Sequence, residues 1–224
     1  MTGELSWWES FRIYLEFRWQ HILELAIDHV VVVVISVVLA TVVGVALGFA
    51  TYRSERGREL VLAITGTFLT IPSLALFGLF IAIPGLGLGG RSVVLGLLLY
   101  GLLPIVRNTI VGLREVDPAI VESAQGMGLG RWHRLLRIEL PLAWPVIITG
   151  MRVSTLLLIG IAAIGAYING PGLGQDIFAG LAHIGGASAL NEVLGGTLGI
   201  IALAVLFDLV YVAVSWITIP KGIR

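Results

Sequence analysis

The charged residues Arg107, Arg152 and Asp208 lie within or at the edge of long apolar segments. Ionisable side chains are costly inside a lipid bilayer, so they are usually paired or functional there. Asp208 lies between Phe207 and Leu209, and two interpretations are open for it. Its carboxylate pairs with Arg152, Arg107 or backbone donors, or it contacts a cationic or zwitterionic substrate.

A polar stretch, residues 122–141, is the longest interruption between the apolar segments. Just before it, Asp117-Pro118 provides a helix-capping residue followed by a proline at the first helical position, which predicts a short helix through Glu122. Gly128 is expected to end this helix with a positive φ. A second short helix should follow from Arg131, and Pro141 should open the next apolar segment. The pattern predicts a helix, a turn and a helix at a membrane surface.

Other groups that could do chemistry are scarce. The chain has no cysteine, and its four histidines, His21, His29, His133 and His183, lie far apart, so we expect no metal site. No carboxylates are spaced for acid–base catalysis, and no Ser/His/Asp arrangement can be identified. The chain has one lysine, Lys221, and no G-x-x-x-x-G-K-[ST] loop, so it cannot be its own P-loop ATPase. We predict that it is not an enzyme and holds no cofactor.

The composition is that of an integral membrane protein. Hydrophobic residues make up 57% of the chain and charged residues 12%, whereas about a quarter of the residues of a soluble domain are charged. The 29 glycines agree, because small residues let membrane helices approach closely. Lys+Arg and Asp+Glu both number 14, so there is no basic excess to recruit nucleic acid.

The apolar segments predict an all-α fold with about five transmembrane helices. About 20 residues suffice to span a bilayer as a helix, and a lone strand would leave its backbone unsatisfied in lipid. Residues 1–25 have apolar residues at three- and four-residue spacing, which predicts an amphipathic helix in the membrane interface. A kink is expected at Pro72. The predicted transmembrane domain is 26–218, with spans 26–52, 60–83, 92–111, 142–168 and 194–218, a loop 112–141 and a tail 219–224.

The distribution of arginine and lysine predicts the orientation, since cytoplasmic loops carry the excess of these residues. Loop 53–59 holds three arginines, loop 112–141 holds four, and the C-terminal tail holds Lys221 and Arg224. The loop 169–193 holds none. We therefore expect the N-terminus outside the cell and the C-terminus and loop 112–141 in the cytoplasm.

The polar stretch resembles the "EAA" signature of the permeases of ATP-binding-cassette importers. The signature reads E-A-A, three residues, G, nine residues, I, any residue, L-P, and Ser123 replaces its first alanine. In that family the segment is the cytoplasmic coupling helix that docks on the ATPase subunit. The resemblance implies this ATPase-coupling role for Glu122, Ser123, Ala124, Gly128, Ile138, Leu140 and Pro141.

Two further segments, 70–76 and 103–118, resemble the osmoprotectant branch of this family, the permeases for glycine betaine, choline and carnitine. The likeness runs from about residue 26 to the C-terminus. It implies the type I importer fold in a bacterial-type cell membrane, cytoplasmic ATPase subunits that bind ATP and Mg²⁺, an external substrate-binding protein, and a second permease that is identical or related. Loop 169–193, with a short helix expected at 175–181, is either a packed loop or a contact for the binding protein.

The predicted function is therefore that of the membrane-spanning permease subunit of an ATP-driven importer of compatible solutes. The alternative is a stand-alone secondary transporter or channel for small solutes. Secondary transporters usually show repeated halves, and five spans do not divide into matching halves.

Overall fold

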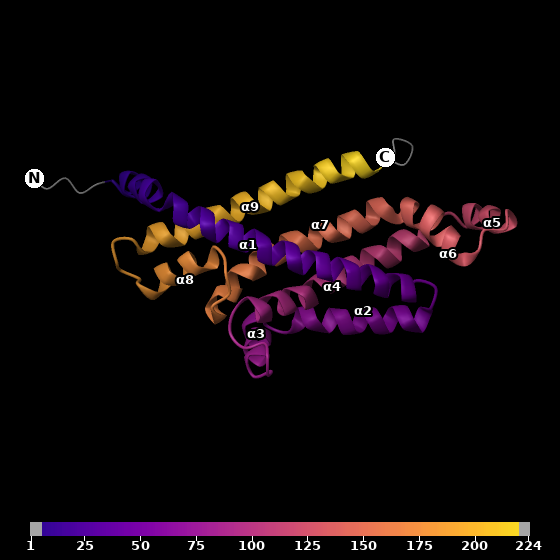
Figure 1. Cartoon of the computed structure of the whole chain (residues 1–224), viewed down its shortest axis with the longest axis horizontal. Helices are drawn as coiled ribbons and strands as arrows, with labels where there is room; N and C mark the ends of the chain where they lie inside the picture. Colours follow the sequence, from indigo (N-terminus) through magenta and orange to yellow (C-terminus); the bar gives the residue numbers. More distant parts are fainter. Residues whose placement is uncertain (1–5, 220–224) are drawn as a thin grey trace, which may run out of the picture. The chain divides into compact units, whose positions relative to one another are not determined.

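The structure is a computed structural model that describes residues 6–219, and all regular elements in that range are helices (Figure 1). The all-α prediction is confirmed. In chain order the elements are α1 (Trp7–Thr51), α2 (Glu55–Thr70), α3 (Ser73–Ile81), α4 (Gly90–Arg114), α5 (Pro118–Gly126), α6 (Arg131–Arg134), the π-helical turn η1 (Leu135–Glu139), α7 (Leu140–Gly165), the 3₁₀ turn η2 (Ala166–Ile168), α8 (Gly174–Ala182) and α9 (Ala189–Thr218).

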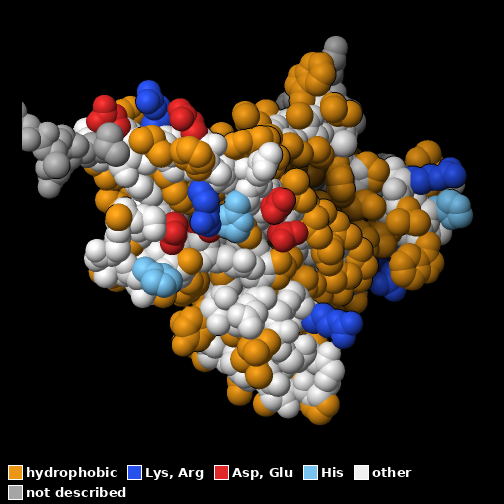
Figure 2. Space-filling view, turned by 60° about the vertical axis from the view of Figure 1, so that its left-hand side comes forward, with side chains coloured by type: hydrophobic (Ala, Val, Ile, Leu, Met, Phe, Trp, Pro, Cys, Tyr) orange, Lys and Arg blue, Asp and Glu red, His pale blue; other side chains and the backbone are white. Residues whose placement is uncertain are grey.

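Four of these helical segments are long and apolar enough to cross a membrane: α1, α4, the segment Arg131–Ile168, and α9. The pair α2 and α3 passes the same test together, although the chain bends by 93° between them. The described residues thus hold four spans, or five if the bent pair is one span. Large apolar side chains remain exposed on these helices, and Figure 2 shows hydrophobic side chains spread over much of one face.

Helix α1 differs from the prediction because it has no break near residue 25. The interfacial helix predicted for residues 1–25 and the span predicted for 26–52 are one helix of 45 residues. Residues 19–27 contain no glycine and no proline, so nothing in the local backbone stops the helix where its composition changes. Residues 1–5 of the predicted interfacial helix lie outside the described range, as do residues 220–224 of the predicted tail.

The kink expected at Pro72 is a complete break between α2 and α3. Ile71, at the C-terminus of α2, is extended with φ −76° and ψ 127°, the conformation that a following proline favours. The carbonyl of Ile71 accepts a hydrogen bond from the Tyr100 hydroxyl at 2.6 Å. A side chain of α4 therefore satisfies a backbone acceptor at the end of α2.

The chain divides into two compact units, and α1, α4, α7 and α9 contribute to both. One unit comprises Met1–Ser36, Pro72–Leu97 and Leu158–Leu206. In it, α8 forms the short helix expected in the loop 169–193. Asp176 of α8 is buried and accepts hydrogen bonds from the Tyr14 hydroxyl at 3.1 Å and from Arg18 at 3.4 Å. These contacts hold α8 against the first half of α1.

The other unit comprises Val37–Ile71, Leu98–Leu157 and Phe207–Arg224. Glycines let its helices approach closely, because a Cβ atom at Gly48 of α1 would lie 2.5 Å from Thr109 of α4, and one at Gly150 of α7 would lie 2.8 Å from the Pro104 carbonyl oxygen. The core of this unit is the cluster Tyr52, Val61, Val106, Ile110, Leu113, Leu135, Ala143 and Ile147. This core lies beside the polar stretch that the sequence singles out.

Candidate functional site

Helix α5 begins and ends close to the residues that predict its two ends. Asp117 caps the helix by accepting a hydrogen bond from the Ala119 N–H at 2.8 Å, and Pro118 stands at the first turn. After the helix, the Gly128 N–H donates to the Gln125 carbonyl at 2.9 Å. Gly128 has φ +81°, which confirms the expected left-handed conformation.

The second part of the stretch differs from the prediction at Pro141. A helical path begins at Arg131, passes through the π-helical turn η1 and continues into α7 without interruption. Pro141 therefore does not open the helix but follows its π turn. Proline lacks the N–H that an α-helix needs in its interior, and the wider turn directly before it lets the chain remain helical.

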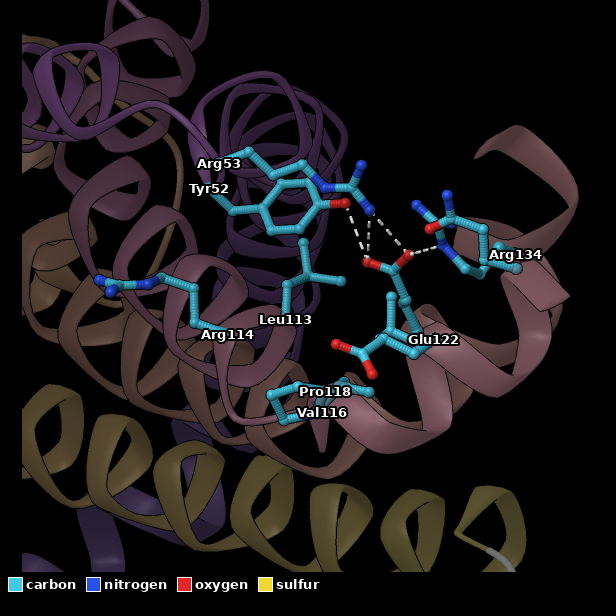
Figure 3. A pocket seen from close by; sticks show the side chains of 11 residues that line it. Tyr52, Arg53, Leu113, Arg114, Val116, Pro118, Glu122 and Arg134 are labelled. Carbon is cyan, nitrogen blue, oxygen red and sulfur yellow. Dashed lines mark hydrogen bonds and ion pairs between the residues drawn. The ribbon is translucent and has the colours of Figure 1, made fainter. Parts of the chain in front are cut away.

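Glu139 forms the centre of a buried ionic cluster at this turn. Only 2% of its surface is exposed. Its carboxylate accepts hydrogen bonds from Arg134 Nε at 2.9 Å, from the Tyr52 hydroxyl at 2.9 Å and from Arg53 Nη2 at 3.0 Å. Figure 3 draws these interactions as dashed lines. Below, these four residues are called the Glu139 cluster.

The Glu139 cluster connects separate parts of the chain. Tyr52 and Arg53 follow the end of α1, Arg134 belongs to α6, and Glu139 ends the π turn. Arg134 also reaches α5, since its Nη1 donates to the Gln125 side-chain oxygen at 3.4 Å. Burial, together with the neighbouring Glu139 carboxylate, raises the pKa of the Tyr52 hydroxyl. Tyr52 therefore remains a hydrogen-bond donor to Glu139 at physiological pH.

Beside the Glu139 cluster is an open pocket of about 420 Å³. Figure 3 shows that side chains of the α1–α2 turn, α4 and α5 surround it. Its polar lining combines both signs of charge, which suits contact with a charged protein surface. The residues that line it are Tyr52, Arg53, Leu113, Arg114, Val116, Pro118, Val121, Glu122, Gln125, Arg134 and Glu139.

The residues predicted for ATPase coupling divide into an exposed group and a buried group. Glu122, Ser123, Gly128 and Pro141 are exposed, Ala124 is buried, and Ile138 and Leu140 are half-buried. Two large apolar side chains, Met127 and Trp132, are also exposed in this segment, at 72% and 69%. The exposed residues of the segment thus form an outward surface. Its buried and half-buried residues pack against the rest of the chain.

The Glu139 cluster is not among the sites that the sequence predicts. Glu139 occupies the unspecified position between the isoleucine and leucine of the signature, so the motif drew no attention to it. One available signal was a carboxylate directly before an apolar segment, with Arg134 five residues earlier. A buried carboxylate needs a cationic or hydrogen-bonding partner.

The three intramembrane charge candidates are placed differently. Arg152 of α7 and Asp208 of α9 form a bidentate ion pair, with Nε–Oδ1 2.6 Å and Nη2–Oδ2 2.7 Å. Of the partners considered for Asp208, the structure thus shows Arg152. Arg107 of α4 is exposed and takes no part in this pair. Three residues farther along both helices, the Thr155 and Tyr211 hydroxyls lie 2.8 Å apart.

Among residues 6–219 no group of three or more His, Asp or Glu could hold a metal ion.

Comparisons with known proteins agree on one family. The family described as "Binding-protein-dependent transport system inner membrane component" matches residues 40–216. The chain is 35% identical over 197 residues to the glycine betaine/carnitine/choline transport system permease protein OpuCB of Bacillus subtilis, covering 88% of each chain. It is 37% identical over 207 residues to the osmoprotectant import permease protein OsmW of Salmonella typhimurium, covering 91% of this chain and 94% of the relative.

A solved structure of the MetNI methionine ABC transporter, in an inward-facing conformation, shares the fold. Its matching chain gives a TM-score of 0.76 at 20% identity, with 88% of this chain and 95% of that chain covered. At this identity the likeness concerns the fold alone. The helical fold and the match over residues 40–216 show that this chain belongs to the family of binding-protein-dependent transport system inner membrane components, multi-pass membrane proteins that act as translocation subunits.

Proposed function

We propose that this chain is the permease subunit of an ATP-driven importer of quaternary ammonium osmoprotectants such as glycine betaine, choline or carnitine. One observation carries the proposal. Two permeases named for osmoprotectant transport are 35% and 37% identical to this chain and cover 88% and 91% of it. The alternative of a stand-alone transporter is not kept, because the family is binding-protein-dependent.

In this proposal a separate cytoplasmic ATPase binds ATP and Mg²⁺ and docks on α5 and α6. The chain itself has no P-loop. The exposed Glu122 and Ser123 on α5, with Met127 and Trp132 beside them, provide a mixed polar and apolar surface for the ATPase. Glu122 supplies a carboxylate for a donor on that partner.

The Glu139 cluster connects the proposed docking surface to the membrane-crossing helices. Gln125 of α5 accepts from Arg134, and Arg134 donates to Glu139, which directly precedes α7. Tyr52 and Arg53 tie the same carboxylate to the end of α1. These contacts connect α5 to α7 and to the end of α1, so a displacement of α5 by the ATPase would be transmitted to both.

The remaining partners are an external binding protein and a second permease, identical or related. In the most apolar part of α9 only 6% of the residues are buried within the chain, which leaves this helix available to a second permease. The excess of arginine and lysine in loops 53–59 and 112–141 supports an N-terminus outside and a C-terminus in the cytoplasm.

Solute uptake tests the proposal. Cells that lack this protein should lose ATP-dependent uptake of glycine betaine, choline or carnitine at high osmolarity, and the wild-type gene should restore it. A strain lacking only the partner ATPase should lose the same uptake. Unchanged uptake of all three solutes, in a strain with no other system for them, would contradict the proposal.

A further inference from the structure

The Arg152–Asp208 ion pair stays partly open although both residues lie in membrane-crossing segments. Arg152 lies in α7 and Asp208 in α9, both among apolar residues of membrane-crossing segments. Yet the two side chains keep 41% and 34% of their surface exposed. Exposed charge cannot face hydrocarbon at an acceptable free energy. The open side of the pair must therefore face water or protein.

A buried pair of hydroxyl groups lies one helical turn from the ion pair. Residues three apart on a helix share a face, so Thr155 follows Arg152 on α7 and Tyr211 follows Asp208 on α9. The Thr155 and Tyr211 hydroxyls lie 2.8 Å apart and both residues are buried. The open part of this face is thus the guanidinium and the carboxylate, and the buried Thr155–Tyr211 contact lies one helical turn farther along.

We propose that this face is a substrate site in the translocation pathway, and that it takes a zwitterion with a quaternary ammonium group and a carboxylate. The inference rests on the proposed function and narrows its substrate class. The carboxylate of the solute binds the Arg152 guanidinium, and its ammonium group lies by the Asp208 carboxylate. A quaternary ammonium group has no N–H to donate, so the charge of the Asp208 carboxylate, and not a hydrogen bond, recognises it.

Charge balance explains why a zwitterion suits this site. A bound zwitterion replaces one ion pair by two, and each of the four charges remains compensated. A simple cation such as choline would pair with Asp208 and leave Arg152 without a counter-charge. Unpaired charges away from water are strongly disfavoured. When no solute is bound, Arg152 and Asp208 neutralise each other, so neither charge is left unpaired in the empty site.

The experiment uses the complete importer, with its ATPase and binding protein, in proteoliposomes. Uptake of glycine betaine and of choline is measured at saturating binding protein for the wild type and for Arg152→Gln. Choline carries the same trimethylammonium group without a carboxylate. Dividing each variant rate by the wild-type rate for the same solute cancels the preferences of the binding protein. We expect Arg152→Gln to lower glycine betaine uptake at least tenfold and choline uptake less than threefold.

A double variant separates binding from folding. Arg152→Gln with Asp208→Asn removes both charges, so no unpaired charge remains, and hydrogen bonding between the side chains is retained. We expect this variant to insert, to purify with its ATPase and to lose at least tenfold in uptake of both solutes. As a matched control, Arg12→Gln removes an exposed arginine that pairs with Glu16 at 3.6 Å, and both uptake rates should remain unchanged.

Two results would overturn the inference while leaving the proposed function intact. The first is wild-type uptake of both solutes by the double variant, which would show that the pair is only structural. The second is an equal loss of glycine betaine and choline uptake in Arg152→Gln. A wild-type complex that transports no quaternary ammonium compound at all would instead overturn the proposed function.

Discussion

Glu139 and its partners show how a single buried charge can organise the end of a helix bundle. The carboxylate is 2% exposed and has two arginines within hydrogen-bonding distance. The two cations are not equivalent, because the Arg134 side chain is 9% exposed and the Arg53 side chain 39%. Water screens Arg53 and weakens its pairing. Arg134 therefore contributes most of the compensation for the buried carboxylate.

This asymmetry predicts a graded loss of stability. Glu139→Gln leaves two arginines without a counter-charge and should lower the free energy of unfolding by about 3–5 kcal/mol, as the breaking of buried pairs does. Arg134→Gln should cost a similar amount, and Arg53→Gln about 1 kcal/mol or less. Thermal unfolding of the purified permease in detergent measures the order. The exposed Glu122→Gln is the control and should leave the unfolding temperature unchanged, whereas equal effects of Glu122→Gln and Glu139→Gln would contradict the prediction.

The Glu139 cluster could not be predicted from sequence for a physical reason. Tyr52 and Arg53 lie 87 and 86 residues before Glu139, so only tertiary packing brings them together. The Arg152–Asp208 pair could be anticipated although its members are 56 residues apart. Few charges occur in the apolar segments, which leaves few possible partners for Asp208.

At the scale of elements, α5 is a short helix whose ends are both fixed by local backbone chemistry. Its N-terminal cap is Asp117 and its termination is the left-handed Gly128, and signals of this kind can be read from sequence. The continuity of α1 and the π turn η1 could not be read in this way. A membrane interface changes the preferred side chains without changing the backbone, and a π turn depends on how the helix packs.

The conformation of Gly128 predicts that a valine there abolishes the coupling of ATP hydrolysis to transport without preventing insertion into the membrane. A valine at φ +81° would cost about 1–2 kcal/mol, which an inserted helical protein can tolerate. Apart from its chain neighbours, no residue within 6–219 has an atom within 4 Å of a Cβ built at Gly128, so the new side chain would project into the space where we propose that the ATPase docks. We expect Gly128→Val to insert normally and to abolish transport, as measured by uptake and by substrate-stimulated ATP hydrolysis in the reconstituted complex.

Gly130 supplies the matched comparison for that experiment. It has φ −64° and ψ 159°, which any residue adopts, and among the described residues other than its chain neighbours a Cβ atom there likewise meets nothing within 4 Å. Gly130→Ala should therefore retain most of the uptake and most of the stimulated ATP hydrolysis. Full coupling in Gly128→Val would show that the segment is a connection only, with no role in transmitting ATPase movement.

At the scale of the whole molecule, each long helix contributes to both compact units. The unit with α5 and α6 carries the arginine-rich loops 53–59 and 112–141, and the unit with α8 carries loop 169–193, which has no arginine or lysine. The uneven basic charge predicts that loops 53–59 and 112–141 face the cytoplasm. Loop 169–193 should then face the side from which a binding protein delivers its solute.

Cysteine labelling tests this orientation directly, because the natural chain contains no cysteine. Ser54 and Ser188 are both exposed, so a cysteine at either position is accessible to a reagent that cannot cross the membrane. Ser54 caps α2 by accepting from the Gly57 N–H at 3.1 Å, and its loss costs about 1 kcal/mol, too little to invert the protein. We expect Ser54→Cys to react in inside-out vesicles and Ser188→Cys in intact spheroplasts. The reverse pattern would place the docking surface of α5 outside the cell, where no ATPase could reach it.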